Sequence, residues 1–319
     1  MTQLVITQGD PAGVGPELLL RVADAGLLGP DDRVVAGRGT LRALAEALDQ
    51  PWATRGLELI EPLLEPGPDE LGQFAALEIG VDRVLMALEA EPGNTPGLVT
   101  APIDKAVASA EGLRPPGNTE YLAERAGVQD FAMLMAGSVI RVVLATIHLP
   151  LREVPARLDA AAVERAGALL ARCLIRDLGI AAPRVGVLGL NPHAGERGLL
   201  GDEEQTVIAP ALAALEAWAA QQDLPVRFVG PLPADTAFHH HQVGTLDGLV
   251  AMYHDQGLGP FKLAHFHDGV NVTLGLPFVR TSPDHGTAKD IAGRGVADAR
   301  SMAAAITMAR EMVRTRTGV

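Results

Sequence analysis

Apolar and polar positions alternate along this chain in a pattern that predicts two kinds of element. Short runs rich in Val, Leu and Ile have the character of buried strands, and longer stretches rich in Ala, Leu and Glu have the spacing of amphipathic helices. The predicted strands lie within residues 4–7, 33–37, 97–102, 139–148, 184–193 and 248–253. The predicted helices lie within residues 16–26, 40–50, 71–91, 159–179, 203–222 and 298–317. This alternation is typical of an α/β protein with a largely parallel sheet.

The composition is that of a globular protein with ample material for a core. The chain has 319 residues, of which 48% are hydrophobic, enough for two domains of ordinary size. No apolar stretch approaches the roughly 18 residues that a membrane helix needs, and the first residues lack the features of a signal peptide. Cys173 is the single cysteine, so no internal disulfide is expected and the cytoplasm is the predicted location.

The charge balance narrows the classes of partner. A formal net charge of −13 argues against a nucleic-acid or lipid surface, and it means that any anionic ligand needs a local group of cations. Only three of the 26 basic residues are lysines, namely Lys105, Lys262 and Lys289. Because lysine offers a compact ammonium that arginine does not supply, Lys105 and Lys262 are predicted to be functional and Lys289 to be incidental.

Polar side chains follow the predicted strands where each strand ends. The ends read Gln8-Gly9-Asp10, Asp104-Lys105, Ile147-His148, Asn191-Pro192-His193 and His254-Asp255-Gln256. Since ligands bind beyond the carboxyl ends of parallel strands, the three histidines are expected at one rim. Three neutral imidazoles suit Zn²⁺ or a similar divalent ion, with Asp255 orienting a ring. A single strand-end histidine is more often structural, so the shared placement carries the metal hypothesis.

The remaining histidines and the glycine-rich loops give weaker signals. Residues 239–241 are predicted to form a solvated loop, and His265 and His267 are left without a role. The GDPAGVGPE segment at 9–17 matches neither the dinucleotide fingerprint nor the Walker A loop, so it is either a tight turn or a rim that exposes backbone amides to a ligand. The SPDHGTAKDIAGRGVAD segment at 282–298 is a candidate nucleotide cradle.

Eight motifs along nearly the whole chain resemble one family. They are GDPAGVGPE, TAPIDK, GNTEYLA, ATIHLPL, GLNPHAGERGLLGDEE, PLPADTAF, AMYHDQGLGPFK and GVNVTLGLPFVRTSPDHGTAKDIAGRG. In this order they resemble the 4-hydroxythreonine-4-phosphate dehydrogenase family of pyridoxal phosphate biosynthesis. The resemblance implies two α/β/α domains around a cleft, related to isocitrate and isopropylmalate dehydrogenases and not to the Rossmann fold. We expect a cofactor-side domain at 1–130 plus 285–319 and a metal-binding, dimerising domain at 131–284, in a homodimer whose active site lies at the subunit interface.

The same resemblance implies a reaction. Relatives oxidise 4-phosphooxy-L-threonine with NAD or NADP and a divalent metal, and the product loses CO₂ to give 3-amino-2-oxopropyl phosphate. Zinc is the first expectation for the metal, with Mg, Mn or Co as alternatives. The small anionic, phosphorylated substrate is the expected partner, with no nucleic acid and no membrane.

Residue roles carry over by position. The family's metal ligands match His148, His193 and His254, and its substrate-binding positions match Thr119, Lys262, Asn271 and Arg280. Cofactor contacts are expected near His285, Gly286 and Asp290. Lys262, Asp235 and Asp255 are candidates for catalytic proton transfer or orientation, and structural hydrogen bonding is an equal alternative for the two aspartates.

One substitution leaves the substrate open. The family usually has histidine where this chain has Asn118, and asparagine keeps a donor and an acceptor but carries no charge. The alternative is therefore a related dehydrogenase of phosphorylated threonate or erythronate, or of a cis-dihydrodiol. A metallohydrolase, a phosphotransacetylase-like acyltransferase and a non-catalytic phosphosugar sensor are further rivals.

Overall fold

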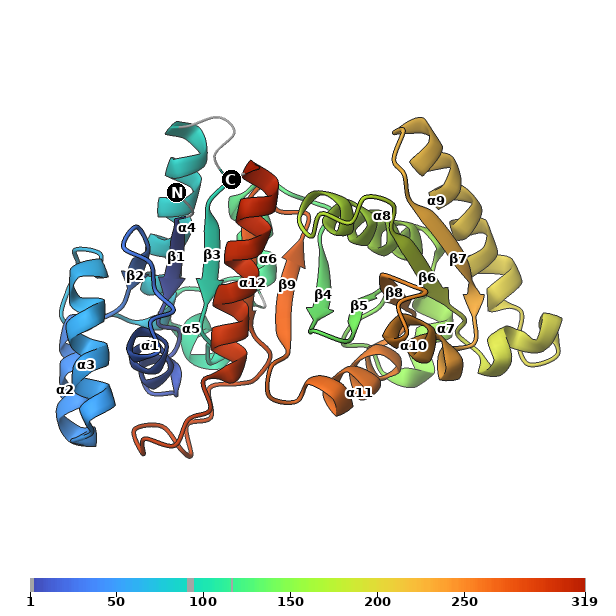
Figure 1. Ribbon diagram of the computed structural model, residues 1–319. Coiled ribbons are helices and arrows are strands. Elements are labelled where there is room, and N and C mark those ends of the chain that lie inside the picture. The colour runs from blue at the N-terminus through green and yellow to red at the C-terminus, as the bar shows by residue number, and fades with distance from the viewer. Residues whose placement is uncertain (1–2, 91–94, 116, 319) are drawn as a thin grey trace. The chain divides into compact units, whose positions relative to one another are not determined.

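Two units make up the chain in the computed structural model, which describes residues 3–90, 95–115 and 117–318 (Figure 1). The first unit comprises Met1–Gln129 and Leu276–Val319, and the second comprises Asp130–Gly275. The chain thus leaves the first unit once and returns to it at Leu276, nine residues before the boundary expected at 285. The strand β10 therefore belongs to the first unit.

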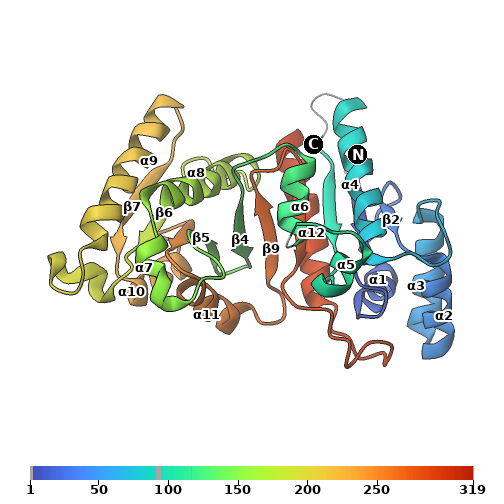
Figure 2. The same cartoon turned by 180° about the vertical axis from the view of Figure 1, so that it is seen from behind.

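The first unit is built on a parallel sheet with the strand order β2-β1-β3-β10. Its strands are β1 (Leu4–Thr7), β2 (Arg33–Val35), β3 (Gly97–Thr100) and β10 (Val279–Pro283). Its helices are α1 (Gly15–Asp24), α2 (Arg38–Leu48), α3 (Pro51–Ile60), η1 (Glu61–Leu63), α4 (Gln73–Ala90), α5 (Lys105–Glu111), α6 (Asn118–Arg125) and α12 (Arg300–Thr317). Helix α4 packs on β1, β2 and β3, whereas α12 packs on β3 and β10, and Figures 1 and 2 show them on opposite faces of the sheet.

Helices cover both faces of this sheet, which explains why β1 and β3 consist of continuous buried runs. Every residue of β1 and β3 is buried, as expected for a parallel sheet with helices on both sides. The core between the sheet and α4 contains Val5, Leu77, Val81, Leu98 and Phe278. All four strands end at the same edge, which brings the loops after β1, β3 and β10 together.

The second unit has a mixed sheet with the order β9-β4-β5-β8-β6-β7. Its strands are β4 (Ala132–Ala136), β5 (Arg141–Leu144), β6 (Arg184–Leu188), β7 (Arg227–Leu232), β8 (Gly248–Ala251) and β9 (Val270–Leu274). Strands β5, β8, β6 and β7 are parallel, as predicted. Strand β4 runs antiparallel to both β5 and β9, because the turn at 137–140 is too short for a parallel crossover.

Helices also cover this second sheet. They are η2 (Leu151–Glu153), α7 (Val154–Arg157), α8 (Ala160–Arg176), η3 (Pro192–Gly198), the π-helix η4 (Glu204–Ile208), α9 (Ala209–Gln221), α10 (Ala234–Gln242) and α11 (His254–His265). The core beneath α10 and α11 contains Met135, Val142, Leu249, Ala237 and Phe261. The predicted α/β class is confirmed in both units.

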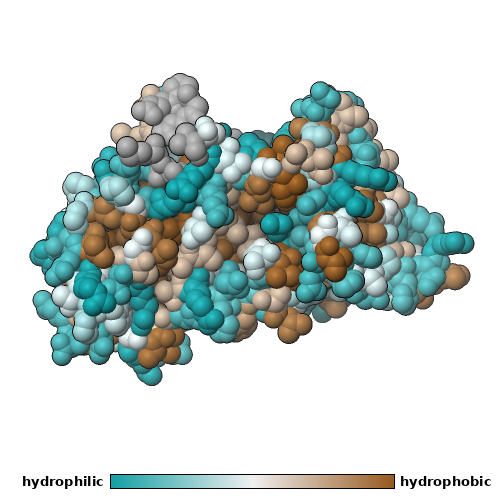
Figure 3. Space-filling model, viewed as in Figure 1, coloured by the Kyte–Doolittle hydropathy of each residue, from teal (hydrophilic) through white to brown (hydrophobic). Residues whose placement is uncertain are grey.

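No helix of the described residues is long and apolar enough to span a membrane. The face drawn in Figure 3 mixes hydrophilic residues with scattered hydrophobic ones.

Candidate active site

Two of the three predicted metal ligands lie side by side in the second unit. His148 follows β5, and the segment before it continues the pairing with β8 through hydrogen bonds from the amides of Ala145 and Thr146. His254 is the first residue of α11, directly after β8. Because β5 and β8 are parallel neighbours, their ends bring the two imidazoles together, with ring centroids 5.7 Å apart.

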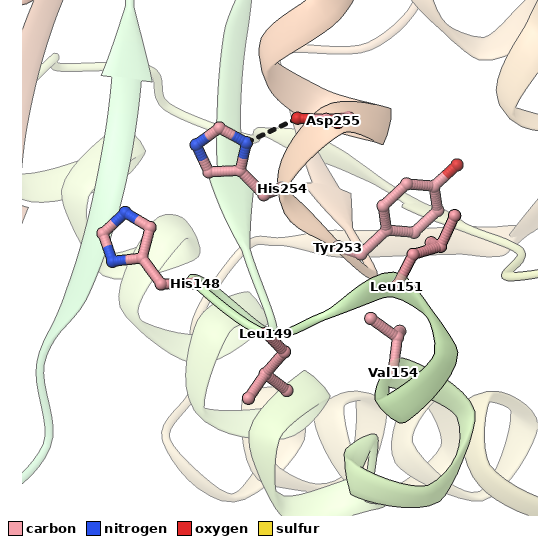
Figure 4. Close-up of a pocket in the computed structure, with 7 residues that line it drawn as sticks. All are labelled: His148, Leu149, Leu151, Val154, Tyr253, His254 and Asp255. Atoms are coloured by element: carbon pink, nitrogen blue, oxygen red, sulfur yellow. Dashed lines mark hydrogen bonds and ion pairs between the residues drawn. The ribbon is translucent and has the colours of Figure 1, made fainter.

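The two rings line a pocket of about 240 Å³ beyond these strand ends (Figure 4). The remaining lining residues are Leu149, Leu151, Val154, Tyr253 and Asp255. One side of the pocket is therefore apolar and the other presents imidazole nitrogens. This combination suits a small ligand that carries a few polar groups.

Asp255 orients the ring of His254. Its carboxylate Oδ1 lies 2.7 Å from Nδ1 of that imidazole, as the dashed line in Figure 4 marks. A carboxylate accepts the Nδ1 proton, which leaves the lone pair of Nε2 available for a ligand. The pair therefore has the geometry expected of a metal-binding histidine and its carboxylate partner.

Gln256 joins the ends of two strands, a role that the sequence did not reveal. Its side-chain oxygen accepts the amide hydrogen of Met252 at 2.7 Å, and its side-chain nitrogen donates to the carbonyl of Gly189, also at 2.7 Å. The first contact holds the end of β8, and the second reaches the segment after β6. The His-Asp-Gln sequence after β8 thus combines a predicted metal ligand, a carboxylate hydrogen-bonded to it and a structural amide.

His193 lies in an unusual left-handed turn. The five residues from His193 to Arg197 all have φ between 44° and 76°, a region that L-residues other than glycine seldom adopt. Only Gly195 adopts it without a steric cost. The predicted strand-to-loop transition after β6 is therefore a turn that needs support from its surroundings.

Glu204 supplies part of that support. This carboxylate is 4% exposed and accepts hydrogen bonds from the backbone amide of Asn191 at 2.7 Å and from its side-chain nitrogen at 3.0 Å. Burial raises the pKa of Glu204, but the hydrogen bonds from Asn191 outweigh burial and the pKa lies below its ordinary value. A Cβ on Gly195 would lie 2.5 Å from Oε2 of the same carboxylate, so the turn is packed directly on Glu204.

The described residues of one chain hold no group of three His, Cys, Asp or Glu side chains that could bind a metal ion. The structure thus brings together His148 and His254, and it does not add His193 or another such side chain to them. The three-histidine site stays a prediction.

Two other histidines are structural, and one expectation about them is wrong. Residues 239–241 lie in α10 and not in a loop, and His241 is buried. Its Nδ1 donates to the carbonyl of Leu246 at 2.7 Å, and its Nε2 accepts from the amide of Arg141 at 2.8 Å. Burial lowers the pKa of His241, which suits a ring that must stay neutral to accept that hydrogen bond.

His265, the last residue of α11, forms hydrogen bonds with the turn between β4 and β5, which His241 also contacts. Its buried Nε2 accepts the amide hydrogens of Val139 and Ile140 at 3.2 and 3.1 Å, while Nδ1 lies 3.2 Å from the carboxylate of Asp268. The turn between β4 and β5 is therefore held by two imidazoles from two helices. This tertiary role has no local sequence signal.

The other predicted residues of the second unit are spread over three elements. Lys262 is half-buried in the last turn of α11, and Asp235 is exposed in the first turn of α10. Asn271 lies in β9, and its side-chain oxygen is buried without a hydrogen-bond partner among the described residues. A buried amide oxygen without a partner is unusual and indicates a place for a donor from a ligand.

Arg280 is a buried cation of the first unit. It lies on β10 with 4% of its surface exposed, and its Nη2 donates to Oγ1 of Thr100 at the end of β3 at 2.7 Å. Burial lowers the pKa of Arg280 to about 10, against the opposing effect of the Glu120 carboxylate. The guanidinium therefore stays charged at neutral pH, and a buried cation of this kind favours an anionic ligand.

Asn118 and Thr119 begin α6 in the same unit. The side-chain oxygen of Asn118 is buried and, like that of Asn271, has no hydrogen-bond partner in the described part of the chain. Lys105 lies close to the start of this helix, since a Cβ on Gly117 would be 3.6 Å from its Nζ. These groups would suit a ligand with both donors and negative charge.

The glycine-rich loop after β1 is explained by close packing of neighbouring loops. A Cβ on Gly9 would lie 2.3 Å from the carbonyl oxygen of Pro102, and one on Gly13 would lie 2.7 Å from that of Thr287. Of the two interpretations left open above, these contacts favour a tight turn. The turn packs against the loops after β3 and β10.

The predicted cofactor residues lie in the loop at 284–298, between β10 and α12. His285, Gly286 and Asp290 are all exposed there. The loop packs on the start of α1, where the amide of Val14 donates to the carbonyl of Thr287 at 2.9 Å. Lys289, predicted to be incidental, instead forms ion pairs with two carboxylates of this edge.

Comparisons with known proteins identify one family. Residues 79–309 match the family model described as "Pyridoxal phosphate biosynthetic protein PdxA". The 4-hydroxythreonine-4-phosphate dehydrogenase of Erythrobacter litoralis is 43% identical over 333 aligned positions, covering 98% of this chain and 97% of the relative.

Solved structures give the same result. The crystal structure of a 4-hydroxythreonine-4-phosphate dehydrogenase from Klebsiella pneumoniae has a TM-score of 0.82 at 36% identity and covers 98% of both chains. A terephthalate 1,2-cis-dihydrodiol dehydrogenase from Burkholderia xenovorans has a TM-score of 0.64 at 27% identity, covering 99% of this chain and 98% of that one. The chain therefore belongs to the family of the pyridoxal phosphate biosynthetic protein PdxA.

Proposed function

We propose that this protein is an NAD(P)-dependent and divalent-metal-dependent dehydrogenase. It oxidises the secondary alcohol of 4-phosphooxy-L-threonine and promotes decarboxylation to 3-amino-2-oxopropyl phosphate, a step in pyridoxal phosphate biosynthesis. The observation that carries the proposal is the pair of imidazoles at the ends of β5 and β8, 5.7 Å apart, in a chain of this family. The proposed location is the cytoplasm.

The residues present fit a divalent cation. His148 and His254 line one pocket, and the hydrogen bond of His254 to Asp255 leaves a nitrogen lone pair for coordination. His193 is proposed as the third ligand because its position matches that of a metal ligand in the family, not because of its place in the single chain. When bound, a divalent cation of this kind supplies Lewis-acid stabilisation of negative charge on the substrate oxygen.

The charged and polar residues of each unit suit the substrate. Arg280, buried and charged, binds an anionic group, and Lys262 contributes a second cation. The buried amide oxygens of Asn118 and Asn271 accept hydrogen bonds from an ammonium or hydroxyl group, both of which this substrate carries. Thr119 adds a neutral hydrogen bond.

Proton transfer or orientation is assigned to three side chains of the second unit. Lys262 is the proposed proton-transfer group, because an ammonium can donate a proton and its pKa can be tuned. Asp255 holds the Nδ1 proton of His254. Asp235, exposed at the start of α10, is retained as a further candidate.

The nicotinamide cofactor, NAD or NADP, is assigned to the loop at 284–298. His285, Gly286 and Asp290 are exposed on this loop and are available for contact. The loop is anchored on α1 and on the ends of β1 and β3, and these contacts restrict its conformations. Preorganisation of this kind strengthens binding.

A homodimer with the active site at the subunit interface completes the proposal. The second unit exposes more than half of several large apolar side chains, including Leu151, Leu199, Leu263 and Phe266. Single exposed apolar side chains are common on protein surfaces, so the proposal of a dimer rests on the family resemblance, and these side chains are candidates for its interface. A second copy of this chain is the proposed partner, and the mass in solution, measured by light scattering, tests it.

The activity is tested by NADH or NADPH absorbance with a substrate panel. The panel contains 4-phosphooxy-L-threonine, 4-phospho-threonate, 4-phospho-erythronate and a cis-dihydrodiol, each with and without a chelator. We expect the phosphorylated amino acid to give the highest kcat/KM and the chelator to abolish turnover. Absence of cofactor reduction with every substrate would contradict the assignment as a dehydrogenase.

The cis-dihydrodiol is included because of one observation. The terephthalate dihydrodiol dehydrogenase is 27% identical and shares the fold along the whole chain, and Asn118 removes a chargeable group from a predicted substrate contact. If the diol is the best substrate, the second candidate function replaces the first.

A further inference from the structure

One lysine joins the ends of three strands in the first unit. The ammonium of Lys289 lies 3.0 Å from Oδ2 of Asp10 and 2.6 Å from Oδ2 of Asp104. Asp10 follows β1, Asp104 follows β3, and Lys289 lies in the loop that follows β10. A single side chain therefore connects the three loops at this edge of the sheet.

Both carboxylates are fixed by their own loops. Asp10 is almost fully buried, and its Oδ1 accepts the amide hydrogen of Ala12 at 2.9 Å. Asp104 caps α5, where its Oδ1 accepts the amides of Ala106 and Val107 at 2.9 and 3.2 Å. In each aspartate Oδ1 accepts hydrogen bonds from nearby backbone amides, and Oδ2 faces the ammonium of Lys289. The arrangement is that of a prepared cation site occupied by Lys289.

The charge states of these groups also indicate a cation site occupied by Lys289. The hydrogen bond to Asp104 and the nearby carboxylate of Asp10 raise the pKa of Lys289, and the hydrogen bond from Lys289 lowers the pKa of Asp104. The ammonium and the Asp104 carboxylate therefore stay ionised at neutral pH. Without the lysine, two carboxylates would face the same space, one of them buried and without a cation.

The loop at 284–298 has anchors on both sides of Lys289. On one side the amide of Val14 donates to Thr287. On the other side Glu17, which is fully buried, accepts the amides of Gly295 at 3.2 Å and Ala297 at 2.9 Å. Between them the loop turns through local hydrogen bonds, and Ala288, next to Lys289, has the left-handed φ of 44°. The ion pairs hold the loop at this unfavourable conformation.

We propose that Lys289 is a positioning residue that fixes the loop at 284–298 in the form that binds the nicotinamide cofactor. The part of this proposal that concerns the cofactor rests on the function proposed above. Loss of the lysine frees the middle of the loop, and the cofactor must then order it on binding, which lowers affinity. The carboxylates of Asp10 and Asp104, left without their ammonium partner, also repel the anionic dinucleotide.

The test uses the full-length protein and four variants. Lys289→Met removes the ammonium, and Asp104→Asn removes one charge while keeping a side chain that can cap α5. The double variant with both substitutions lacks the ammonium but keeps only one of the two carboxylate charges. It therefore separates loss of the ion pairs from repulsion between the carboxylates. Arg294→Met is the matched control, because it removes an exposed cation from the same loop.

The first measurement is amide hydrogen exchange of the loop without cofactor. We expect exchange at 286–294 to be about three- to tenfold faster in Lys289→Met, in line with a partly exposed ion-pair network, and unchanged in the Arg294→Met control. Because salt screens exposed charges, 0.5 M KCl should reduce the difference, to about half. Unchanged exchange in Lys289→Met overturns the proposal whatever the cofactor does.

The second measurement is the Kd for NAD⁺ and NADP⁺ by calorimetry, together with KM and kcat. In Lys289→Met we expect Kd and KM of the cofactor to rise by about three- to tenfold, with kcat at saturating cofactor nearly unchanged. Equal cofactor affinity in wild type and variant overturns the positioning role. If wild type binds neither nucleotide, the function proposed for the loop fails, and faster exchange in the variant still identifies Lys289 as its structural anchor.

Discussion

Two pairs of histidines in the second unit show how one residue type takes opposite roles. His148 and His254 lie at strand ends with their rings side by side, and His254 pairs Nδ1 with a carboxylate. His241 and His265 are buried, and each engages both ring nitrogens with protein groups. The first pair retains lone pairs for a ligand, whereas the second pair uses them to hold the backbone of one hairpin.

The difference teaches that position within the sheet, and not residue type, decides the chemistry. The first pair lies beyond the carboxyl ends of parallel strands, where side chains face open space. The second pair lies on α10 and α11 themselves, where both rings contact the hairpin of β4 and β5. Replacing members of each pair should therefore affect different measurements.

The largest expected effect is on activity. His254→Ala removes a proposed metal ligand, so kcat/KM should fall by more than about 100-fold, beyond the 10- to 100-fold typical of losing a partner of a ligand. Bound metal, measured by elemental analysis, should fall in parallel while the unfolding free energy changes little. The exposed His240→Ala is the control. A variant that keeps both metal and turnover would remove His254 from the site.

The next effect is on stability. His265→Leu leaves the buried amide of Ile140 and the part-buried amide of Val139 without their acceptor, and a buried, unsatisfied group costs about 1–3 kcal/mol. The unfolding free energy from urea titration should therefore drop by about 2–5 kcal/mol. His240→Leu, which is exposed, should change it by less than about 0.5 kcal/mol. Equal stability of the two variants would show that the hairpin does not depend on His265.

The contrast between these pairs marks what the sequence could and could not predict. The strand ends were predictable, because an apolar run that stops at His148 or His254 is a local pattern. The burial of His241 and His265 was not, because it depends on helices packing against a hairpin about 100 or more positions away.

Lys289 and His193 illustrate the same limit. Lys289 meets a carboxylate 185 positions away, so its composition-based interpretation as incidental failed. The left-handed turn at His193 follows no hydrophobic period, and its support by Glu204 is a tertiary contact. Local patterns thus predicted the α/β class and the polar side chains at the strand ends, whereas contacts across loops set the detailed arrangement.

A smaller effect separates the two aspartates that pair with histidines. Asp255→Asn removes the carboxylate that orients His254, so metal affinity measured by chelator competition should weaken about 10- to 100-fold. Stability should hardly change, because the pair is exposed. Asp268→Asn makes the matching change beside His265 and should leave metal affinity unchanged. Similar metal affinities in both variants would contradict the orienting role of Asp255.

The smallest effect is a dependence of stability on pH that belongs to His241. Burial lowers the pKa of His241 in the folded protein, whereas the unfolded chain keeps the ordinary value near 6.5. Above that value both states are neutral and the contribution is complete. As pH falls below it, the unfolded chain binds a proton first, so stability decreases until the folded ring is protonated as well.

His241→Gln isolates this contribution, because an amide can donate to Leu246 and accept from Arg141 without titrating. Between about pH 6.5 and pH 5 the wild type should lose up to about 1.4 kcal/mol per pH unit from this ring, and the variant should lose correspondingly less. The other histidines contribute alike to both proteins, so the difference between the two urea-titration curves reports His241 alone. Parallel curves would mean that the ring can be protonated in place, and that its hydrogen bond to the hairpin does not require the neutral form.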